Sequence, residues 1–278
     1  MSIGLGILSW RGEESLQNAL ASYMQENLFS LFNEKVIFLP EQRQQETVLA
    51  QRHGLSVHGD AKNLGILGGF KALAHAMTSD VILLLENDCP LIEDHSEAKR
   101  QISLGYNLIK NRKAEIIRLR SREHPGQDWG VNRKYRGFYP DQNSGFFEKS
   151  YKRIKRLCRP MKAAYLKGAS LYEGHSEAQR FPDIVHYHDT SDYYIVGSRY
   201  MPWTNQSILI DRDFFLKNII QIAENMQTKR RINGFKNIEI EMNSSFWREA
   251  DYRIAIMKGL FTHSRIGHRG YIIPRNIA

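Results

Sequence analysis

The chain has 278 residues, of which 42% are hydrophobic and 25% are charged, and these values exclude a largely disordered protein. This length can bury a sizeable core, so we expect one elaborated α/β domain. The net charge of +9 favours an anionic partner such as a nucleotide diphosphate, a nucleic acid or an acidic membrane face.

Cysteine content and the amino terminus bear on where the protein works. Cys89 and Cys158 are the only cysteines, too few for a disulfide framework or a zinc cluster, which indicates a reducing compartment. The amino terminus lacks a basic segment ahead of its short apolar run, and no run approaches the roughly 20 apolar residues that a membrane helix needs. We therefore expect a cytoplasmic protein, peripheral to a membrane if it contacts one at all.

The first 60 residues alternate between short apolar strands and helices. Strands are predicted at 3–9, 36–39 and 55–58, with helices at 13–31 and 42–52 between them. Strands that alternate with helices at this interval indicate a parallel sheet of βαβ units. Such a sheet is typical of nucleotide-binding proteins, but also of many others.

Residues 63–88 predict a helix that leads into a buried strand. The first half has helical apolar spacing, and the continuous apolar run 81–85 is typical of a strand covered on both faces. The strand ends in Glu86-Asn87-Asp88, whose carboxylates at i and i+2 share one side. Ligands of open α/β sheets bind at this end of the strands, where carboxylates suit a divalent cation bound to phosphates. A short acidic triplet is also frequent in solvated loops, so that alternative stays open.

Two motifs here resemble those of the GT-A fold glycosyltransferases that use nucleotide diphosphate sugars, in particular the family-2-like group. Asn63-Leu64-Gly65 matches an Asn-x-Gly at the head of a helix, and the acidic triplet matches an Asp-x-Asp after the next strand, with Glu86 replacing the first Asp. The resemblance covers residues 1–90 and returns more loosely over 200–270. It implies an α/β fold with a GT-A type, Rossmann-like, mostly parallel sheet flanked by helices.

The resemblance also implies a domain organisation. We expect a single catalytic domain over residues 1–278. Its nucleotide-sugar-binding half would span 1–120, and its acceptor-side half would span 121–278 and contain a basic insertion at 145–190.

In that family, the ends of the first two strands hold the base and ribose, and the last acid of the triplet and a late histidine bind the metal. The implied nucleotide contacts are Ser9, Trp10, Arg11, Glu41, Asn63, Glu86 and Asn87. The implied ligands of Mn²⁺ or Mg²⁺ are Asp88 and His263, with His268 as the neighbour that could replace His263. An aromatic ring or guanidinium can stack on a base, and a carboxylate can accept a ring N–H of uracil, although a core role for Trp10 is equally open.

The middle of the chain carries a basic segment. Residues 121–145 predict a long irregular excursion of the kind that often forms a binding loop. Residues 149–167 then contain eight Lys or Arg and no acid, with apolar residues at helical spacing up to Pro160. A basic amphipathic helix indicates an anionic membrane surface or an acidic partner, although a charge run is more often a solvated face.

His186 and His188 would share one side of a strand, as two metal ligands could. Without a cysteine or a third histidine nearby, we favour a structural role for this pair.

The last 80 residues hold the candidate catalytic base. A strand at 207–210 leads into a helix at Asp211, and another helix is predicted from Ile238 to Lys258, ending at Gly259. The resemblance places a catalytic carboxylate at the start of that second helix. Glu241 is the first candidate and Glu239 the second, while Glu249 and Asp251 also stay open. Acids at a helix start can also simply complement the helix dipole.

Together with these patterns, the resemblance implies a metal-dependent hexosyl- or pentosyltransferase. It would move a sugar from a nucleotide diphosphate donor, with a UDP-sugar preferred, to a hydroxyl of a glycan, lipid-linked or protein acceptor, and inversion is a family-level expectation. One alternative is a sugar-phosphate nucleotidyltransferase, although residues 9–13 poorly match its Gly-rich loop. The other is a non-enzymatic cationic module that binds membranes or nucleic acid through residues 149–167. No recognised nucleic-acid-binding motif occurs in the sequence, so we expect no nucleic-acid partner.

Overall fold

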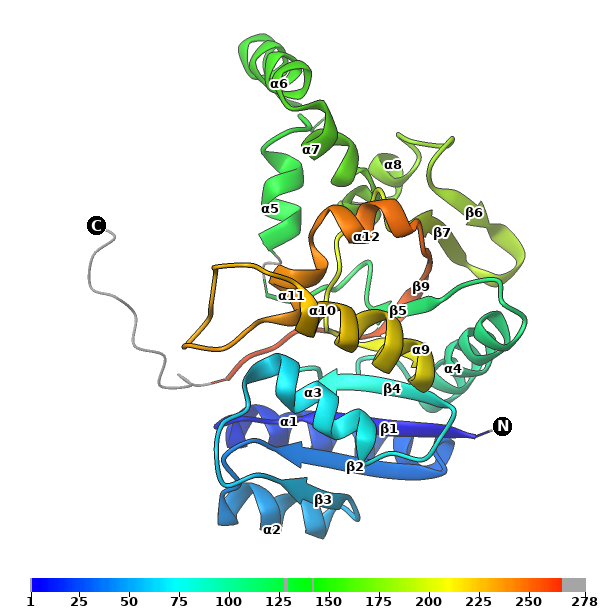
Figure 1. Cartoon of the computed structure of the whole chain (residues 1–278). Coiled ribbons are helices and arrows are strands. Elements are labelled where there is room, and N and C mark those ends of the chain that lie inside the picture. Colours follow the sequence, from blue (N-terminus) through cyan, green and yellow to red (C-terminus); the bar gives the residue numbers. More distant parts are fainter. Residues whose placement is uncertain (1, 128–129, 142, 267–278) are drawn as a thin grey trace.

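The centre of the molecule is one twisted sheet, seen in a computed structural model of which residues 2–127, 130–141 and 143–266 are described. Nine strands of these ranges form it in the order β3-β2-β1-β4-β8-β5-β9-β7-β6 (Figure 1). The strands are β1 (Ile3–Leu8), β2 (Glu34–Leu39), β3 (Ser56–Gly59), β4 (Val81–Glu86), β5 (Ile116–Arg120), β6 (His186–His188), β7 (Tyr193–Gly197), β8 (Ile208–Asp211) and β9 (Arg253–Phe261). Only β8 and β7 run against the common direction, which confirms the predicted mostly parallel α/β sheet.

Helices cover both faces of the sheet (Figure 1). The α-helices are α1 (Glu13–Gln25), α2 (Gln44–Arg52), α3 (Gly65–His75), α4 (His95–Lys110), α5 (Gly130–Arg136), α6 (Phe146–Cys158), α7 (Pro160–Tyr165), α8 (His175–Ala178), α9 (Arg212–Phe214), α10 (Gln221–Asn225), α11 (Ile238–Met242) and α12 (Ser245–Ala250). The 3₁₀-helices are η1 (Leu28–Leu31), η2 (Lys167–Tyr172) and η3 (Asp189–Ser191), and η4 (Phe215–Ile220) is π-helical. No helix within the described ranges is long and apolar enough to cross a membrane.

Two hydrophobic cores lie on opposite faces of the sheet, and β4 contributes to both. Leu83 packs with residues of α1 and α4, whereas Leu84 packs with residues of α3 and η4. Because successive side chains of a strand point to opposite faces, an all-apolar strand needs cover on both sides. The buried strand predicted at 81–85 is therefore confirmed, and it fixes the acidic triplet at the carboxyl edge of the sheet.

A smaller third core forms a lobe beyond the sheet. Val131 and Tyr135 of α5 pack there against Ala163 of α7 and Leu166. Helix α6 is joined to this lobe and stands at the top of the molecule, away from the sheet (Figure 1). The predicted helix that carries the basic segment is confirmed, and it breaks at Arg159, directly before Pro160.

The helix predicted from Ile238 to Lys258 is wrong. Two short helices, α11 and α12, occupy its first half, and Asp251 then takes a left-handed conformation with φ of 48° that ends α12. The second half is β9, which pairs with β5 and β7 and buries Ile254 to Met257 on both faces. Branched side chains at alternate positions suit a central strand better than a helix, and that preference prevailed here.

Three smaller differences separate prediction and structure. The helix predicted at 13–31 ends at Gln25, because Asn27 is left-handed with φ of 48° and starts η1. The segment 121–145 is not wholly irregular, since it contains α5. Strand β7 was not predicted, although it pairs with β9 along its whole length.

Candidate active site

The carboxyl ends of β1, β2 and β4 bring several predicted nucleotide contacts to one edge of the sheet. β1 and β4 are neighbouring parallel strands, so the turn at Ser9 lies beside the acidic triplet. The Asn87 amide donates to Ser9 Oγ at 3.0 Å and to the Gly12 carbonyl at 3.1 Å. A Cβ at Gly12 would lie 1.9 Å from Asn87 Nδ2, so this close approach requires glycine.

Ser9 and Asn87 lie beneath the site rather than on its open surface. Both are buried, and the Ser9 hydroxyl donates to the buried carboxylate of Glu46 at 2.7 Å. Glu46 also accepts from the Gly12 N–H at 3.3 Å. These side chains therefore support the turn on which Trp10 and Arg11 stand. Glu46 was not predicted from the sequence, because a glutamate inside an ordinary helix gives no signal of its own.

Trp10, Arg11 and Glu41 form a second cluster at the same edge. Glu41 accepts from Trp10 Nε1 at 2.8 Å and from both Nε and Nη2 of Arg11, at 2.9 and 2.6 Å. The hydrogen bonds from Arg11 and then Trp10 lower the pKa of Glu41 to about 2. Glu41 is therefore anionic at neutral pH and holds the Trp10 ring in place, while the Arg11 guanidinium lies 5.2 Å from the centre of that ring.

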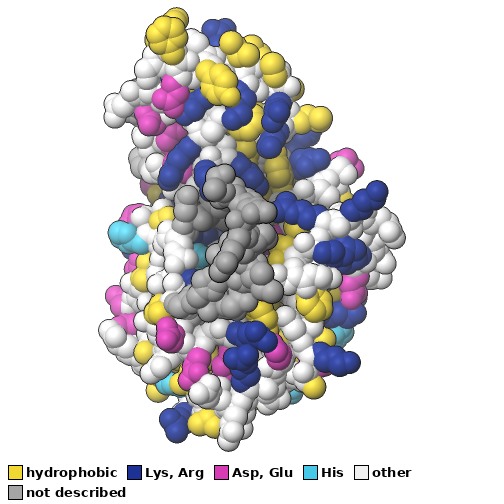
Figure 2. Space-filling view, turned by 90° about the vertical axis from the view of Figure 1, so that its left-hand side faces the viewer, with side chains coloured by type: hydrophobic (Ala, Val, Ile, Leu, Met, Phe, Trp, Pro, Cys, Tyr) yellow, Lys and Arg dark blue, Asp and Glu magenta, His cyan; other side chains and the backbone are white. Residues whose placement is uncertain are grey.

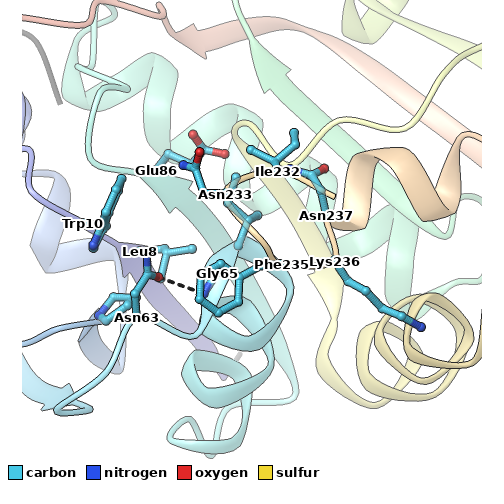
Figure 3. Close-up of a pocket in the computed structure, with 12 residues that line it drawn as sticks. Leu8, Trp10, Asn63, Gly65, Glu86, Ile232, Asn233, Phe235, Lys236 and Asn237 are labelled. Atoms are coloured by element: carbon cyan, nitrogen blue, oxygen red, sulfur yellow. Dashed lines mark hydrogen bonds between the residues drawn. The ribbon is translucent and has the colours of Figure 1, made fainter. Parts of the chain in front are cut away.

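A pocket lies between this edge and the loop at 226–237. Trp10, Asn63 and Glu86 line it on the side of the sheet, and Asn233 and Phe235 lie on the loop side (Figure 3). The Gly65 N–H donates to Asn63 Oδ1 at 2.8 Å, which shapes the head of α3. The pocket measures about 60 Å³. Ligand sites usually exceed about 300 Å³, so this pocket is smaller than an ordinary ligand site.

Phe235 of the loop lies against the glycine of the Asn-x-Gly motif. Gly65 has φ of 67°, a region that favours glycine, and a Cβ there would lie 2.6 Å from Phe235 Cβ. Glycine at this position therefore serves both the backbone conformation and the approach of the loop.

Asp88 and His263, the predicted metal ligands, lie side by side. The His263 Nε2 is 3.2 Å from Asp88 Oδ2, at the ends of β9 and β4. Asp88 is completely buried, and Arg265 Nε lies 3.1 Å from the same oxygen. A carboxylate oxygen and an imidazole nitrogen, completed by diphosphate oxygens, are donors that Mn²⁺ and Mg²⁺ accept. His263 Nε2 is buried and lies close to Asp88 Oδ2, but the pair does not have the geometry of a hydrogen bond. The residues thus fit such an ion.

The protein side chains supply only some of the ligands that a bound metal ion needs. The described part of the chain contains no group of three or more His, Cys, Asp or Glu placed to hold one ion. His186 and His188 lie on the exposed strand β6, where the His188 ring stacks on Tyr193 with the ring centres 4.4 Å apart. His268, the alternative ligand, lies outside the described residues.

A larger cavity of about 720 Å³ adjoins the first pocket, and Ile232 and Asn237 line both. Glu239 lines the larger cavity near the start of α11, where Asn237 caps the helix by accepting from the Glu239 N–H at 2.9 Å. Burial raises the pKa of Glu239 above its ordinary value, and hydrogen bonds from Asn205 N–H and the Thr204 hydroxyl offset part of this rise. Four cations, Lys134, Lys162, Arg230 and Arg248, also line the cavity.

The other candidate bases lie elsewhere. Glu241 is completely buried and accepts from the Thr228 hydroxyl at 2.6 Å. Arg231 Nη1 lies 3.7 Å from Oε1 of the same carboxylate. Glu241 therefore anchors the loop at 226–237 rather than lining the cavity. Glu249 and Asp251 are exposed at the far end of α12. The geometry ranks Glu239 above Glu241, the reverse of the order taken from the sequence.

Two buried arginines of β5 were missed. Arg118 and Arg120 are buried at 1% and 3% exposure, on the same side of their strand. Arg118 Nη2 donates to the Pro202 carbonyl, and Arg120 donates to Gln206 Oε1 and to the carbonyls of Pro125 and Gln127 at 2.7 to 2.8 Å. Their positive charges lie near Glu239, and that of Arg120 also acts on Asp88. Two arginines at alternate positions of an otherwise apolar strand were the signal in the sequence that could have identified this pair.

The mostly parallel sheet with helices on both faces, and with the acidic triplet at its carboxyl edge, has the architecture of the GT-A type of α/β fold. Structure comparison confirms this fold. The chain is similar to S. aureus TarS residues 1–349 in complex with UDP-GlcNAc, with a TM-score of 0.51 and 10% identity, over 97% of this chain and 60% of that one. A second crystal structure of S. aureus TarS 1–349 gives a TM-score of 0.50 and 10% identity, over 95% of this chain and 60% of that one.

The chain thus spans about 60% of the length of the structures it matches, and at 10% identity the likeness concerns the fold. No protein family and no curated protein matches the sequence.

Proposed function

We propose that the chain is a glycosyltransferase that moves a sugar from a nucleotide diphosphate donor, preferably a UDP-sugar, to a hydroxyl of an acceptor. The observation that carries this proposal is the adjacency of two cavities. The pocket with Trp10 and Glu86 shares Ile232 and Asn237 with the cavity that holds Glu239. A donor in the first and an acceptor in the second would meet at their common boundary, as transfer requires.

The donor side is assigned to residues 1–120 together with the end of β9. Trp10 offers a ring face to the base, and Asn63 and Glu86 line the space for the ribose and phosphates. Asp88 and His263 would hold Mn²⁺ or Mg²⁺. When bound, such an ion would neutralise charge on the departing diphosphate.

The acceptor side is assigned to residues 121–278, with Glu239 as the general base. Its carboxylate would take the proton of the acceptor hydroxyl as that oxygen attacks the anomeric carbon and the diphosphate leaves. A single displacement of this kind inverts the anomeric carbon. Determination of the product anomer by NMR tests this, since retention of configuration would exclude Glu239 as the base of a single displacement.

The four cations around the larger cavity support an acceptor that carries negative charge, such as a phosphate-bearing glycan or a lipid-linked saccharide.

Both cysteines are free thiols, one buried and one exposed, which supports a reducing compartment such as the cytoplasm.

The test is calorimetric titration of UDP, GDP and dTDP, each with Mn²⁺ and with EDTA. We expect one diphosphate to bind in a metal-dependent manner to the wild type and to Asp213→Asn, a control at an exposed ion pair. We expect Asp88→Asn to lose that binding while its circular dichroism spectrum and melting temperature report a folded protein. Binding of none of the three would overturn the donor site, and release of pyrophosphate from a nucleoside triphosphate would favour a nucleotidyltransferase.

A further inference from the structure

Helix α6 is attached to the rest of the protein by its basic side. Lys155 Nζ donates to the Gly137 carbonyl at 2.7 Å, and Arg156 Nη1 donates to the Phe138 carbonyl at 2.7 Å. Lys152 Nζ lies 3.5 Å from the Tyr139 carbonyl. These three cations hold α6 on the lobe formed by α5 and α7, and no residue of α6 is buried.

The apolar side of α6 faces outward as a consequence. The exposed fractions are 79% for Phe146, 87% for Phe147, 63% for Tyr151, 60% for Ile154 and 72% for Leu157. At about 100° per residue, these side chains fall within one arc of roughly 140°. Figure 2 shows hydrophobic side chains gathered at the top of the molecule, with Lys and Arg among and below them. The hydrophobic effect favours the opposite orientation, so a contiguous face of this kind indicates a binding surface.

The charges around this face identify the chemistry of its partner. Arg153, Arg159 and Lys162 are exposed at its edge and its end. The only acid in α6, Glu148, is already paired with Lys152. A second copy of the chain would bring these cations against one another, which is unfavourable. An anionic bilayer, in contrast, offers both an apolar layer for the aromatic and aliphatic side chains and phosphate groups for the flanking cations.

We propose that α6 lies in the headgroup region of an anionic bilayer with its apolar face inserted. Helix α6 leads directly into α7, whose Met161 and Lys162 line the larger cavity. Docking through α6 therefore brings that cavity toward the membrane. This favours a membrane-borne, anionic acceptor, a consequence that rests on the proposed function, whereas the docking itself does not.

Vesicle flotation tests the docking. The probes are vesicles of phosphatidylcholine alone and vesicles that also contain phosphatidylglycerol. We expect the wild type to bind the anionic vesicles, with binding lost at high salt, and the double variant Phe147→Ser/Leu157→Ser to bind at least about tenfold more weakly. Met24→Ser is the matched control, because Met24 is a 53% exposed apolar residue on α1. It should bind as the wild type does.

A spectroscopic readout reports insertion directly. Cys158 is exposed at the end of α6 and Cys89 is buried, so a polarity-sensitive fluorophore can be attached at Cys158. Its position in the sequence places it within the apolar arc, so we expect a blue shift on addition of anionic vesicles.

Three results would overturn the proposal. The wild type could bind neither kind of vesicle, or the double variant could bind the anionic vesicles as tightly as the wild type. The wild type could also sediment as a dimer that the double variant no longer forms. The nucleotide titration described above uses no lipid. A failure of membrane docking is therefore distinguishable from a failure of the glycosyltransferase assignment.

Discussion

Arg265 donates from Nε to Oδ2 of Asp88 across 3.1 Å, and this carboxylate is completely buried. A buried carboxylate without a counter-charge is costly, so the guanidinium stabilises the site when no metal is bound. His263 Nε2 faces the same oxygen at 3.2 Å. A cation bound by Asp88 and His263, as proposed above, would therefore compete with Arg265 for one oxygen atom.

This competition predicts that Arg265→Gln binds Mn²⁺ more tightly than the wild type. Removal of a positive charge next to a ligand oxygen should lower the dissociation constant by on the order of three- to tenfold. Electron paramagnetic resonance of free Mn²⁺ measures this dissociation constant. Arg253→Gln is the control, since Arg253 pairs with Glu115 away from the site. Unchanged or weaker Mn²⁺ binding in Arg265→Gln would show that the guanidinium does not occupy the metal position.

Substitution of the proposed base should affect turnover and not donor binding. Glu239→Gln keeps the shape and the hydrogen bonds of the side chain but cannot accept a proton, so we expect kcat to fall by about 10²- to 10⁴-fold with the nucleotide affinity unchanged. Steady-state kinetics and calorimetry on the same variant separate the two. Glu241→Gln serves as the comparison, because Glu241 anchors the loop through Thr228. If kcat falls in Glu241→Gln and not in Glu239→Gln, Glu241 is the base, as the sequence alone ranked it.

The pH dependence of the reaction follows from the raised pKa of Glu239. The base works only when ionised, so kcat should fall as the pH drops through that pKa. Since burial favours the neutral acid, this acidic limb should lie above the ordinary glutamate value of about 4.3. A pH profile of kcat in saturating donor and acceptor measures the limb. A limb at or below the ordinary value would contradict the assignment, provided that the fluorescence spectrum shows a folded protein there.

Much of the sheet was predictable because burial on both faces leaves few alternatives. The run 81–85 had to be a central strand, and its position then fixed where Glu86 and Asp88 emerge. The segment 253–261 was mispredicted because a short continuous apolar run does not by its periodicity separate a buried strand from a helix, and the strand preference of Ile254 and Ile256 was given too little weight. Its strand state depends on pairing with β5 and β7, which lie far away in the sequence.

The candidate site was predictable in its residue types but not in its geometry. Glu239 and Glu241 are two residues apart, so on a helix they point about 200° away from each other, and only packing decides which one faces the cavity. The pairing of Arg265 with Asp88 links residues 177 positions apart. No local pattern encodes such a contact. Likewise, Ser9 and Asn87 carry suitable polar groups, but their burial under the turn is evident only in three dimensions.

Phe235 is expected to oppose donor binding in the structure described here. Its side chain packs on Gly65 and leaves a pocket of about 60 Å³, too small for a nucleotide. A donor bound in this pocket would therefore displace the loop at 226–237, and the free energy of that movement would reduce the affinity. Phe235→Ala removes the contact and should tighten UDP binding by on the order of three- to tenfold in calorimetry.

The control is Phe147→Ala, at an exposed phenylalanine of α6 far from the donor pocket in sequence and fold, which should bind UDP as the wild type does. Hydrogen exchange gives an independent readout, because backbone amides of residues 228–236 should exchange faster when UDP displaces the loop. Weaker UDP binding in Phe235→Ala, together with slower exchange, would instead identify Phe235 as a contact of the nucleotide in a loop that closes over it.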